Sequence, residues 1–329
     1  MAKRVLITGC SGYLGSLLVP RLLRHPLVAR VVGVDLRPPA RARAHPKSRF
    51  VLADIRDQYT LRSVLEEEGI DVVFHLAFLD ASRPDDVRAR ETNVNGTLVV
   101  LEAAHKCPRV QKLIIAGSTA AYGACRGNPR PLPESHPLRA SGWAFAEHKR
   151  RVEEELAKAL PQIRRSLQVS VLRLCTVAGP SQRAGGPISR LRALPFAASV
   201  LGRPGGLQFL SEADAQEAFC RAMEAPELRG PFNAVPDDGV SLAEVCRSLG
   251  KRRVPLPYSA LWLGLLLGRR FFGSSIPEGV TGYLAYPVVA SNRKLQETAG
   301  FRCAQGSLEA LRGCVDGLKA TPTARTSPS

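Results

Sequence analysis

RVLITGCSGYLG, residues 4–15, joins a short apolar run to three glycines that recur at every third position. A run without polar alternation is typical of a strand buried on both faces of a parallel sheet. Gly9, Gly12 and Gly15 permit a tight turn, a close approach of the backbone to a phosphate, and close packing of a helix on the strand. The stretch therefore predicts a strand, a turn and a helix N-terminus whose unpaired N–H groups bind a pyrophosphate.

The first half of the chain repeats this alternation of apolar runs and helical segments. Strand-and-helix alternation at these intervals predicts an α/β fold with a Rossmann-type, doubly wound parallel sheet. The strands that begin at Lys112 and Val169 are expected beyond a topological switch point. We predict strands at 4–8, 31–35, 50–54, 72–77, 112–118 and 169–174, and helices at 13–24, 58–68, 86–105 and 145–160.

The pattern changes after Gly179-Pro180, where glycine and proline punctuate the chain. We predict a Rossmann domain over 1–180, a smaller, mostly helical substrate lobe over 181–316 that is intertwined with it, and a disordered tail over 317–329. The apolar stretch 258–269 is too short to span a bilayer. We expect it to be a buried helix of the lobe, so membrane contact is not expected. Helices are predicted at 212–225, 241–250, 258–271, 291–299 and 307–318.

The charge balance is strongly positive. The 46 Lys and Arg residues against 29 Asp and Glu give a formal net charge of +17, which favours anionic partners. A nucleic-acid role is not expected, because stacking aromatics and a recognisable binding module are absent. The eight cysteines are widely spaced without a CxxC pair, which indicates neither a metal site nor a disulfide framework. No signal-peptide core precedes the first strand, so we expect a cytoplasmic protein.

Asp35 identifies the cofactor that the glycine turn would hold. It lies twenty residues after Gly15, at the end of the second predicted strand. A carboxylate there binds both ribose hydroxyls and repels a 2′-phosphate, which favours NAD over NADP. Arg37 weakens that preference. The alternative is a glycine turn beside a solvated Asp, but the strand–turn–helix context favours a dinucleotide site.

Further motifs follow the glycine turn: Asp54-Ile55-Arg56-Asp57, His75-Leu76-Ala77, Asn93-Val94-Asn95-Gly96-Thr97 and Gly117-Ser118-Thr119-Ala120-Ala121-Tyr122-Gly123. With the turn, this set resembles the extended short-chain dehydrogenase/reductases, the NAD-dependent epimerase/dehydratase group that includes UDP-glucose 4-epimerase. The resemblance is specific over about residues 3–180 and looser to about 315. It implies cofactor contacts from Ser11, Tyr13 and Leu14 in the turn, from Asp54 and Ile55 beside the adenine, and from Leu76 and Ala77 along the cofactor. It also implies that Asn93 braces the active-site helix, and that the chain dimerises through the helices near 86–105 and 145–160.

In that family a Ser, a Tyr and a Lys divide the catalytic work. The tyrosine hydroxyl exchanges the substrate proton, and the lysine lowers the pKa of the tyrosine and binds the nicotinamide ribose. Ser118 fits the serine position and Lys149 the lysine position. YxxxK spacing places both side chains on one helix face, and here that spacing puts Phe145 where the tyrosine is expected. Phenylalanine fills the same volume but exchanges no proton.

Three interpretations of Phe145 remain open at the level of the sequence. The protein is a catalytically inactive NAD-binding regulator or scaffold, or another residue replaces the tyrosine, or water or the substrate supplies the proton. Tyr122 is the substitute nearest in sequence. His148 is one by chemistry, although a solvated helix residue is the more ordinary interpretation, and Glu147 and Glu134 are remoter candidates.

The resemblance also suggests the substrate. We expect an oxidoreductase that acts on a nucleotide sugar or another hydroxyl or ketone compound. Arg173 lies where a substrate cleft is expected, but it could equally be a structural ion-pair partner. Phe209-Leu210-Ser211-Glu212-Ala213-Asp214 departs from the family pattern of a His with paired acids, which puts a sugar-nucleotide specificity in doubt.

Overall fold

A seven-stranded parallel sheet forms the centre of the protein. The computed structural model describes residues 2–39, 45–80, 86–182, 187–194, 196–203, 205–272 and 276–320. The strands of the sheet are β1 (Lys3–Thr8), β2 (Val28–Asp35), β3 (Ser48–Leu52), β4 (Val72–His75), β5 (Lys112–Ser118), β6 (Gln168–Leu174) and β10 (Gly230–Ala234). Their spatial order is β10-β6-β5-β4-β1-β2-β3. β2 and β3 are added on one side of β1, and β4, β5, β6 and β10 follow on its other side. This order confirms the doubly wound fold, with the expected switch point between β1 and β4.

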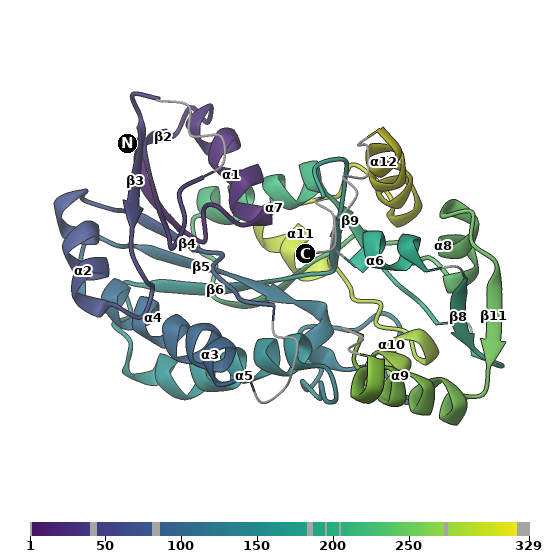
Figure 1. The fold of residues 1–329 in the computed structure, drawn as a ribbon. Helices are drawn as coiled ribbons and strands as arrows, with labels where there is room; N and C mark the ends of the chain where they lie inside the picture. The colour runs from purple at the N-terminus through teal and green to yellow at the C-terminus, as the bar shows by residue number, and fades with distance from the viewer. Residues whose placement is uncertain are drawn as a thin grey trace, which may run out of the picture.

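Helices cover both faces of the sheet (Figure 1). One face carries α1 (Tyr13–Leu23) and α7 (Glu212–Glu224). The other carries α2 (Gln58–Glu67), α4 (Gly96–Lys106) and α5 (Ala144–Ala159). The strands between them are apolar on both faces, and Val5, Ile7 and Phe74 have no exposed surface. The expected Rossmann helices are therefore present within a few residues of their predicted bounds.

The helix predicted over 86–105 contains an irregular turn. It consists of α3 (Val87–Arg90), a π-helical turn over Glu91–Asn95, and α4. A π-helical turn admits an extra residue into the helix and changes the direction of the side chains around it. Asn93 sits in this turn and is fully buried.

The C-terminal lobe returns to the sheet and contains more elements than the sequence predicts. Both α7 and β10 lie beyond residue 180, yet both pack on the Rossmann sheet, so the two parts are interleaved. α12 continues to Ala320, so residues 317–320 of the expected tail are helical, and 321–329 lie outside the described residues. The lobe comprises β7 (Thr176–Ala178), α6 (Pro187–Ala193), β8 (Ala197–Val200), β9 (Phe209–Ser211), α8 (Leu242–Ser248), β11 (Arg253–Leu256), α9 (Tyr258–Phe272), α10 (Val280–Ala285), α11 (Arg293–Ala299) and α12 (Ser307–Ala320).

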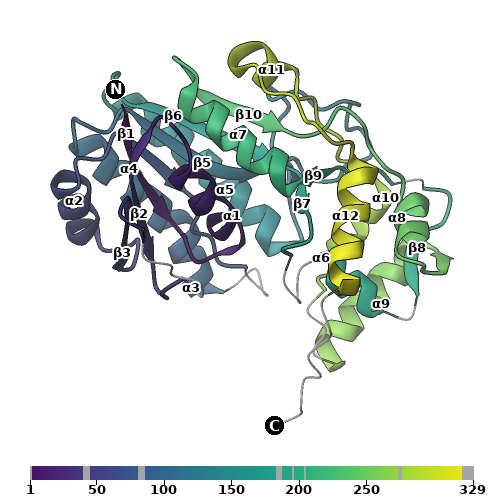
Figure 2. The same cartoon turned by 90° about the horizontal axis from the view of Figure 1, so that it is seen from above.

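The lobe helix α9 corrects an expectation. The sequence predicts that it is buried, but Leu263 is 48% exposed and Phe271 is 70% exposed. Only one side of the helix packs on the lobe, through Leu261 and Leu265. Seen from above, α9 lies along the lower edge of the lobe (Figure 2). None of the helices in the described ranges is long and apolar enough to cross a membrane.

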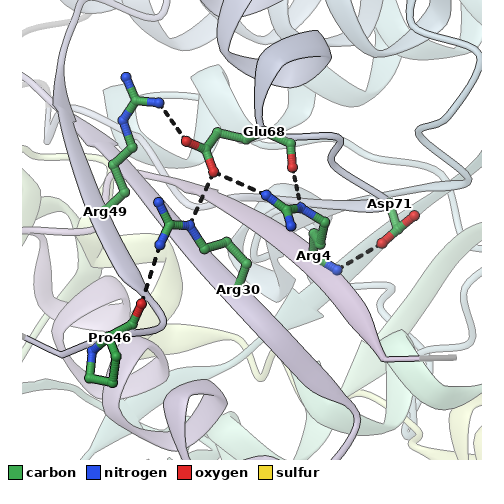
Figure 3. Close-up of polar contacts among 6 residues, drawn as sticks. All are labelled: Arg4, Arg30, Pro46, Arg49, Glu68 and Asp71. Carbon is green, nitrogen blue, oxygen red and sulfur yellow. Dashed lines mark hydrogen bonds and ion pairs between the residues drawn. The ribbon is translucent and has the colours of Figure 1, made fainter.

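A cluster of charges fastens the amino ends of three strands to α2 (Figure 3). Glu68, directly after α2, is 6% exposed. Its carboxylate accepts from Arg4 of β1 at 3.4 Å and from Arg30 of β2 at 3.1 Å, and also from Arg49 of β3. This cluster lies opposite the carboxyl ends of the strands, where the candidate site is found, and we assign it to stability.

The cysteines in the described part of the chain are all free thiols, and six of the eight are buried.

Candidate active site

The turn between β1 and α1 is too closely packed for side chains at two of its glycines. Gly9 has a φ of +72°, and a Cβ built on it would lie 2.6 Å from the Cα of Ala77. A Cβ on Gly15 would lie 2.3 Å from the carbonyl oxygen of Gly9. Gly12 caps α1 without a side-chain hydrogen bond from the described residues. The N–H groups of the first helical turn are therefore available to an anion.

The carboxylate at the end of β2 is fixed by the same turn. The backbone N–H of Ser11 donates to Asp35 Oδ2 at 3.0 Å, and the backbone N–H of Arg37 donates to Oδ1 at 3.2 Å. The Ser11 hydroxyl donates to the Arg37 carbonyl oxygen at 2.7 Å. Each Asp35 oxygen retains a lone pair, which fits two ribose hydroxyls. Arg37 therefore takes part in this arrangement through its main-chain N–H and carbonyl groups.

The first residues of α1 contact the C-terminal half of the chain. The Tyr13 hydroxyl donates to Glu212 Oε1 at 2.7 Å, and burial is the main cause that raises the pKa of Tyr13. Leu14 packs against the core beside it. The neighbouring acid Asp214 accepts from the backbone of Ala304 at 2.8 Å. The acids at 212 and 214 therefore join elements of the fold in this protein.

Asp54 and Ile55 follow β3 and face in different directions. Asp54 is paired with Arg56 at 2.7 Å, and its hydrogen bonds with that guanidinium lower the pKa of Asp54. Ile55 is 5% exposed and packs so closely on α4 that a Cβ on Gly96 would lie 2.7 Å from its Cδ1. Of the two side chains, only that of Asp54 is accessible from the surface.

Asn93 joins the loop after β4 to α5. Its Oδ1 accepts from the backbone N–H of Leu79 at 2.7 Å, and its Nδ2 donates to the Leu79 carbonyl oxygen at 2.9 Å and to His148 Nδ1 at 3.1 Å. Leu76 and Ala77 begin this loop. His148 is 1% exposed, so the interpretation as a solvated helix residue was wrong. Burial lowers the pKa of His148, and with its Nδ1 occupied by Asn93 the residue serves to position α5.

A second buried chain runs behind this loop. Thr97 Oγ1 donates to the Asn93 carbonyl oxygen at 2.6 Å and therefore accepts from His75 Nε2 at 2.9 Å. His75 Nδ1 then accepts from Thr8 Oγ1 at 2.7 Å. Burial lowers the pKa of His75 to about 3, so the ring is neutral. This chain ties the end of β1 to β4 and α4, and the sequence alone did not single it out.

Ser118 and Lys149 each make a hydrogen bond near the carboxyl end of β5. Ser118 ends the strand, and its Oγ accepts from the backbone N–H of Ala120 at 3.2 Å. Lys149 comes from α5, and its Nζ donates to the carbonyl oxygen of Ala116 at 2.6 Å, two residues before Ser118. Lys149 is 8% exposed, and burial lowers its pKa from 10.5 to about 7. The group expected to bind the ribose is therefore able to titrate near neutral pH.

Aromatic rings surround Lys149 where a tyrosine hydroxyl was expected. The Nζ lies 3.7 Å from the centre of the Phe78 ring and 5.9 Å from that of Phe145. Phe145 meets Phe78 edge-on with centroids 5.4 Å apart, and Trp143 lies 5.2 Å away on its other side. Tyr283 of α10 packs edge-on against Trp143 at 5.1 Å.

Tyr122 points into the core, away from any role as a substitute. It has no exposed surface, and its hydroxyl donates to Asn233 Oδ1 at 2.8 Å while accepting from Arg173 at 2.7 Å. Arg173 also pairs with Glu153 at 2.7 Å and donates to the carbonyl oxygen of Glu134 at 3.0 Å. The geometry therefore argues against Tyr122, and Arg173 is a structural ion-pair partner.

Tyr283 is the tyrosine that the structure adds to this region. Its hydroxyl donates to the carbonyl oxygen of Ala120 at 2.7 Å, in the turn that follows Ser118. Burial is the main cause that raises the pKa of Tyr283. Nothing in the local sequence marks this residue, because α10 was not predicted. The lobe thus contributes an aromatic side chain next to the Ser118 turn.

The parallel sheet, the glycine turn and Asp35 define a Rossmann-type dinucleotide fold. Residues 5–227 match the model of the NAD dependent epimerase/dehydratase family. The chain belongs to that family. It is also 30% identical to an uncharacterized protein of Mycobacterium tuberculosis (strain ATCC 25618 / H37Rv), over 97% of this chain and 85% of the relative.

Solved structures agree on the fold. UDP-glucose 4-epimerase of Thermus thermophilus, in complex with NAD, has a TM-score of 0.73 and 25% identity over 97% of this chain and 99% of its own. MoeE5, in complex with UDP-glucuronic acid and NAD, has a TM-score of 0.74 and 24% identity over 96% of this chain and 99% of its own. NAD is bound in both of those structures, and UDP-glucuronic acid is bound in that of MoeE5.

Proposed function

We propose that the protein binds NAD and exchanges hydride between it and a nucleotide sugar or a related hydroxyl or ketone compound. The observation that carries the proposal is the hydrogen bond from Lys149 Nζ to the Ala116 carbonyl oxygen, which brings the lysine to β5 two residues before Ser118. Ser118 ends β5, as Thr8 before the glycine turn ends β1, and ligands of open parallel sheets bind at this edge. We assign the chemistry to these two side chains.

The residues at the cofactor end fit NAD. The uncapped N-terminus of α1 suits a pyrophosphate, because its N–H groups are free and Gly9 and Gly15 admit no side chain. Asp35 offers two oxygens that are already oriented by Ser11 and Arg37. A carboxylate at this position disfavours the 2′-phosphate of NADP. Bound NAD supplies the acceptor for the hydride that leaves the carbon bearing the substrate hydroxyl.

Lys149 carries the proton in this proposal. Burial disfavours its ammonium and lowers its pKa to about 7, although the charge of Glu153 acts in the opposite direction. An amine with such a pKa accepts a proton from a substrate hydroxyl and returns it at neutral pH. Ser118 orients the substrate oxygen, since its hydroxyl hydrogen stays free when Oγ accepts from Ala120.

The net charge of the protein and its similarity to solved structures support the proposed substrate class. A net charge of +17 attracts a diphosphate-bearing compound. Two of the structurally similar proteins named above are complexed with NAD, and one of these also holds UDP-glucuronic acid. We extend the proposal to a homodimer through α4 and α5, which light scattering of the purified protein would test.

Isotope exchange tests the proposed chemistry. The protein is incubated with NAD and a panel of UDP- and dTDP-sugars deuterated on the sugar ring. The mass of the recovered nicotinamide cofactor is then measured by mass spectrometry. We expect deuterium in the reduced cofactor with one sugar class, and none with Ser118→Ala. Exchange that survives Ser118→Ala would show that the reacting site lies elsewhere.

A catalytically inactive NAD-binding regulator is the second candidate. Phe145 favours it, because the YxxxK spacing here lacks a hydroxyl and two aromatic rings surround Lys149. This function predicts tight NAD binding with no deuterium exchange for any sugar in the panel. The same experiment therefore separates the two functions.

A further inference from the structure

The outer face of α9 is apolar although it faces away from the protein. Among the described residues, large apolar side chains exposed by more than a third concentrate in the lobe, and α9 contributes five of them. Trp262 is 39% exposed, Leu263 48%, Leu267 42% and Phe271 70%, and Tyr258 at the first turn is 43% exposed. A helix that is apolar on both its inner and outer faces is normally covered.

The helical repeat gathers four of these side chains, those of Trp262, Leu263, Leu267 and Phe271, on one side. Leu261 and Leu265 point inward and pack with Val200 and Ala285. Positions 262, 263, 266, 267, 270 and 271 fall on the opposite arc of a helix with 3.6 residues per turn. The sequence places Trp, Leu, Leu, Leu, Arg and Phe at them in that order. The outer face is thus an apolar strip with a single basic residue.

The segment that contains α9 is basic. Residues 251–277 include five Lys and Arg residues and no Asp or Glu, and the next residue, Glu278, pairs with Arg269 of α9 at 3.2 Å. Arg270 is exposed at the last turn of α9. At the first turn, Tyr258 lies 6.5 Å from Tyr286, whose ring is in turn 5.3 Å from the Arg203 guanidinium. Neither Arg203 nor Arg270 has an acidic partner in the part of the chain that the structure describes.

We propose that the outer face of α9 docks on the surface of an anionic phospholipid bilayer. Leucine, phenylalanine and tryptophan side chains on one helix face enter the boundary between headgroups and acyl chains, and cations at the ends of the helix meet the lipid phosphates. A twofold contact between two copies would instead bring two acid-free, basic segments together, which like charges oppose. The contact is peripheral, and it does not depend on the proposed chemistry.

Vesicle sedimentation with the full-length protein tests this surface. We expect the protein to sediment with vesicles of phosphatidylcholine mixed with phosphatidylglycerol, but not with phosphatidylcholine alone. Arg270→Ala lowers the partition coefficient by about fivefold, the effect of one cation near an anionic surface. Leu263→Glu with Leu267→Glu lowers it by at least about tenfold, because two exposed apolar contacts are lost. Tyr59→Glu is the matched control: Tyr59 is 90% exposed on α2, and its replacement leaves the partition unchanged.

Fluorescence adds a readout that depends on α9 itself. The chain has two tryptophans, so Trp143→Phe leaves Trp262 as the reporter. We expect its emission to shift to shorter wavelength when mixed vesicles are added. Equal binding to neutral and mixed vesicles, or no binding and no shift, would overturn the proposal. Self-association that Leu263→Glu abolishes, in a protein that does not sediment with vesicles, would assign the face to a second copy instead.

Discussion

The Nζ atom of Lys149 lies 3.7 Å from the centre of the Phe78 ring. On the polar side the same atom donates to the carbonyl oxygen of Ala116 at 2.6 Å. The ring face and the carbonyl both attract a positive charge, whereas removal from water opposes it. Burial dominates and brings the pKa of Lys149 to about 7. The charge of Lys149 thus changes near neutral pH.

This pKa predicts a pH dependence of stability. Lys149 binds a proton up to about pH 10.5 in the unfolded chain but only to about pH 7 in the fold. Between these values the unfolded state holds one more proton, so the free energy of unfolding rises with pH. Lys149→Met removes this contribution. The difference between wild type and variant, from urea denaturation, should change by about 1 kcal/mol from pH 7 to pH 8.

Burial lowers the pKa of Lys112 to about 8, so Lys112 contributes to the pH dependence of stability mainly above pH 8. The window from pH 7 to 8 therefore reports mainly on Lys149. A difference that stays flat across the window would mean that Lys149 keeps its ordinary pKa in the fold.

Restoring the hydroxyl should raise the rate of hydride transfer. In Phe145→Tyr the new hydroxyl stands four residues before Lys149 on the same helix face. We expect the single-turnover rate of NADH formation to rise by about 10²–10⁴-fold, the usual contribution of a positioned acid or base. Phe145→Leu is the control, since it changes the ring without adding a hydroxyl. Equal rates in both variants would place the reacting carbon out of reach of residue 145.

Asn93 should matter more than its neighbour in the same turn. Asn93→Ala leaves the partly buried backbone N–H and carbonyl groups of Leu79 without their partner, and we expect a loss of about 1–3 kcal/mol in the free energy of unfolding. Asn95 is exposed in the same π-helical turn, so Asn95→Ala should change it by less than about 0.5 kcal/mol. Chemical denaturation measures both. Similar losses in the two variants would show that the turn itself, and not the Asn93 side chain, is what stabilises the loop.

Glu68→Gln should weaken the base of the sheet. Burial opposes the charged carboxylate, but hydrogen bonds from Arg49 and Arg30 outweigh it and lower the pKa of Glu68. The neutral variant leaves three guanidinium groups without their shared anion. Because these are partly exposed, we expect a loss of about 1–2 kcal/mol at pH 7. Glu67→Gln, on the exposed side of the same segment, is the control.

The pH dependence of this effect has the same sign as that of Lys149, because in both cases the unfolded state holds more protons, but it falls in the acid range. A depressed carboxyl pKa contributes fully above its ordinary value of 4.5, and the contribution disappears as the pH falls below it. The two proteins should therefore converge in acid, and a difference that persists there would mean that Glu68 acts through shape.

Local sequence patterns were sufficient to predict the strands and helices in the N-terminal half of the chain. The apolar runs ending at Thr8, Asp35, His75 and Ser118 are buried strands, because strands covered on both faces carry no polar alternation. The roles expected for Ser118 and Lys149 came from the family resemblance, and they stay predictions.

Features that depend on distant contacts could not be predicted. The β10 segment reads Gly-Pro-Phe-Asn-Ala, which is typical of a turn, but pairing with β6 makes it an edge strand, where proline is tolerated. Tyr283 reaches the site only because α10 packs on the turn after Ser118. His148 is buried, and its hydrogen-bond partner Asn93 lies 55 residues away in the sequence, in the π-helical turn.

Analysis of the small molecules released when the freshly purified protein is denatured tests the central claim most directly. The account predicts NAD or NADH in the supernatant, together with a nucleotide sugar or a related compound, by mass spectrometry. A protein that releases neither nucleotide, and that binds no added NAD or NADP in calorimetric titration, would contradict it. The glycine turn would then be only a structural element of the fold.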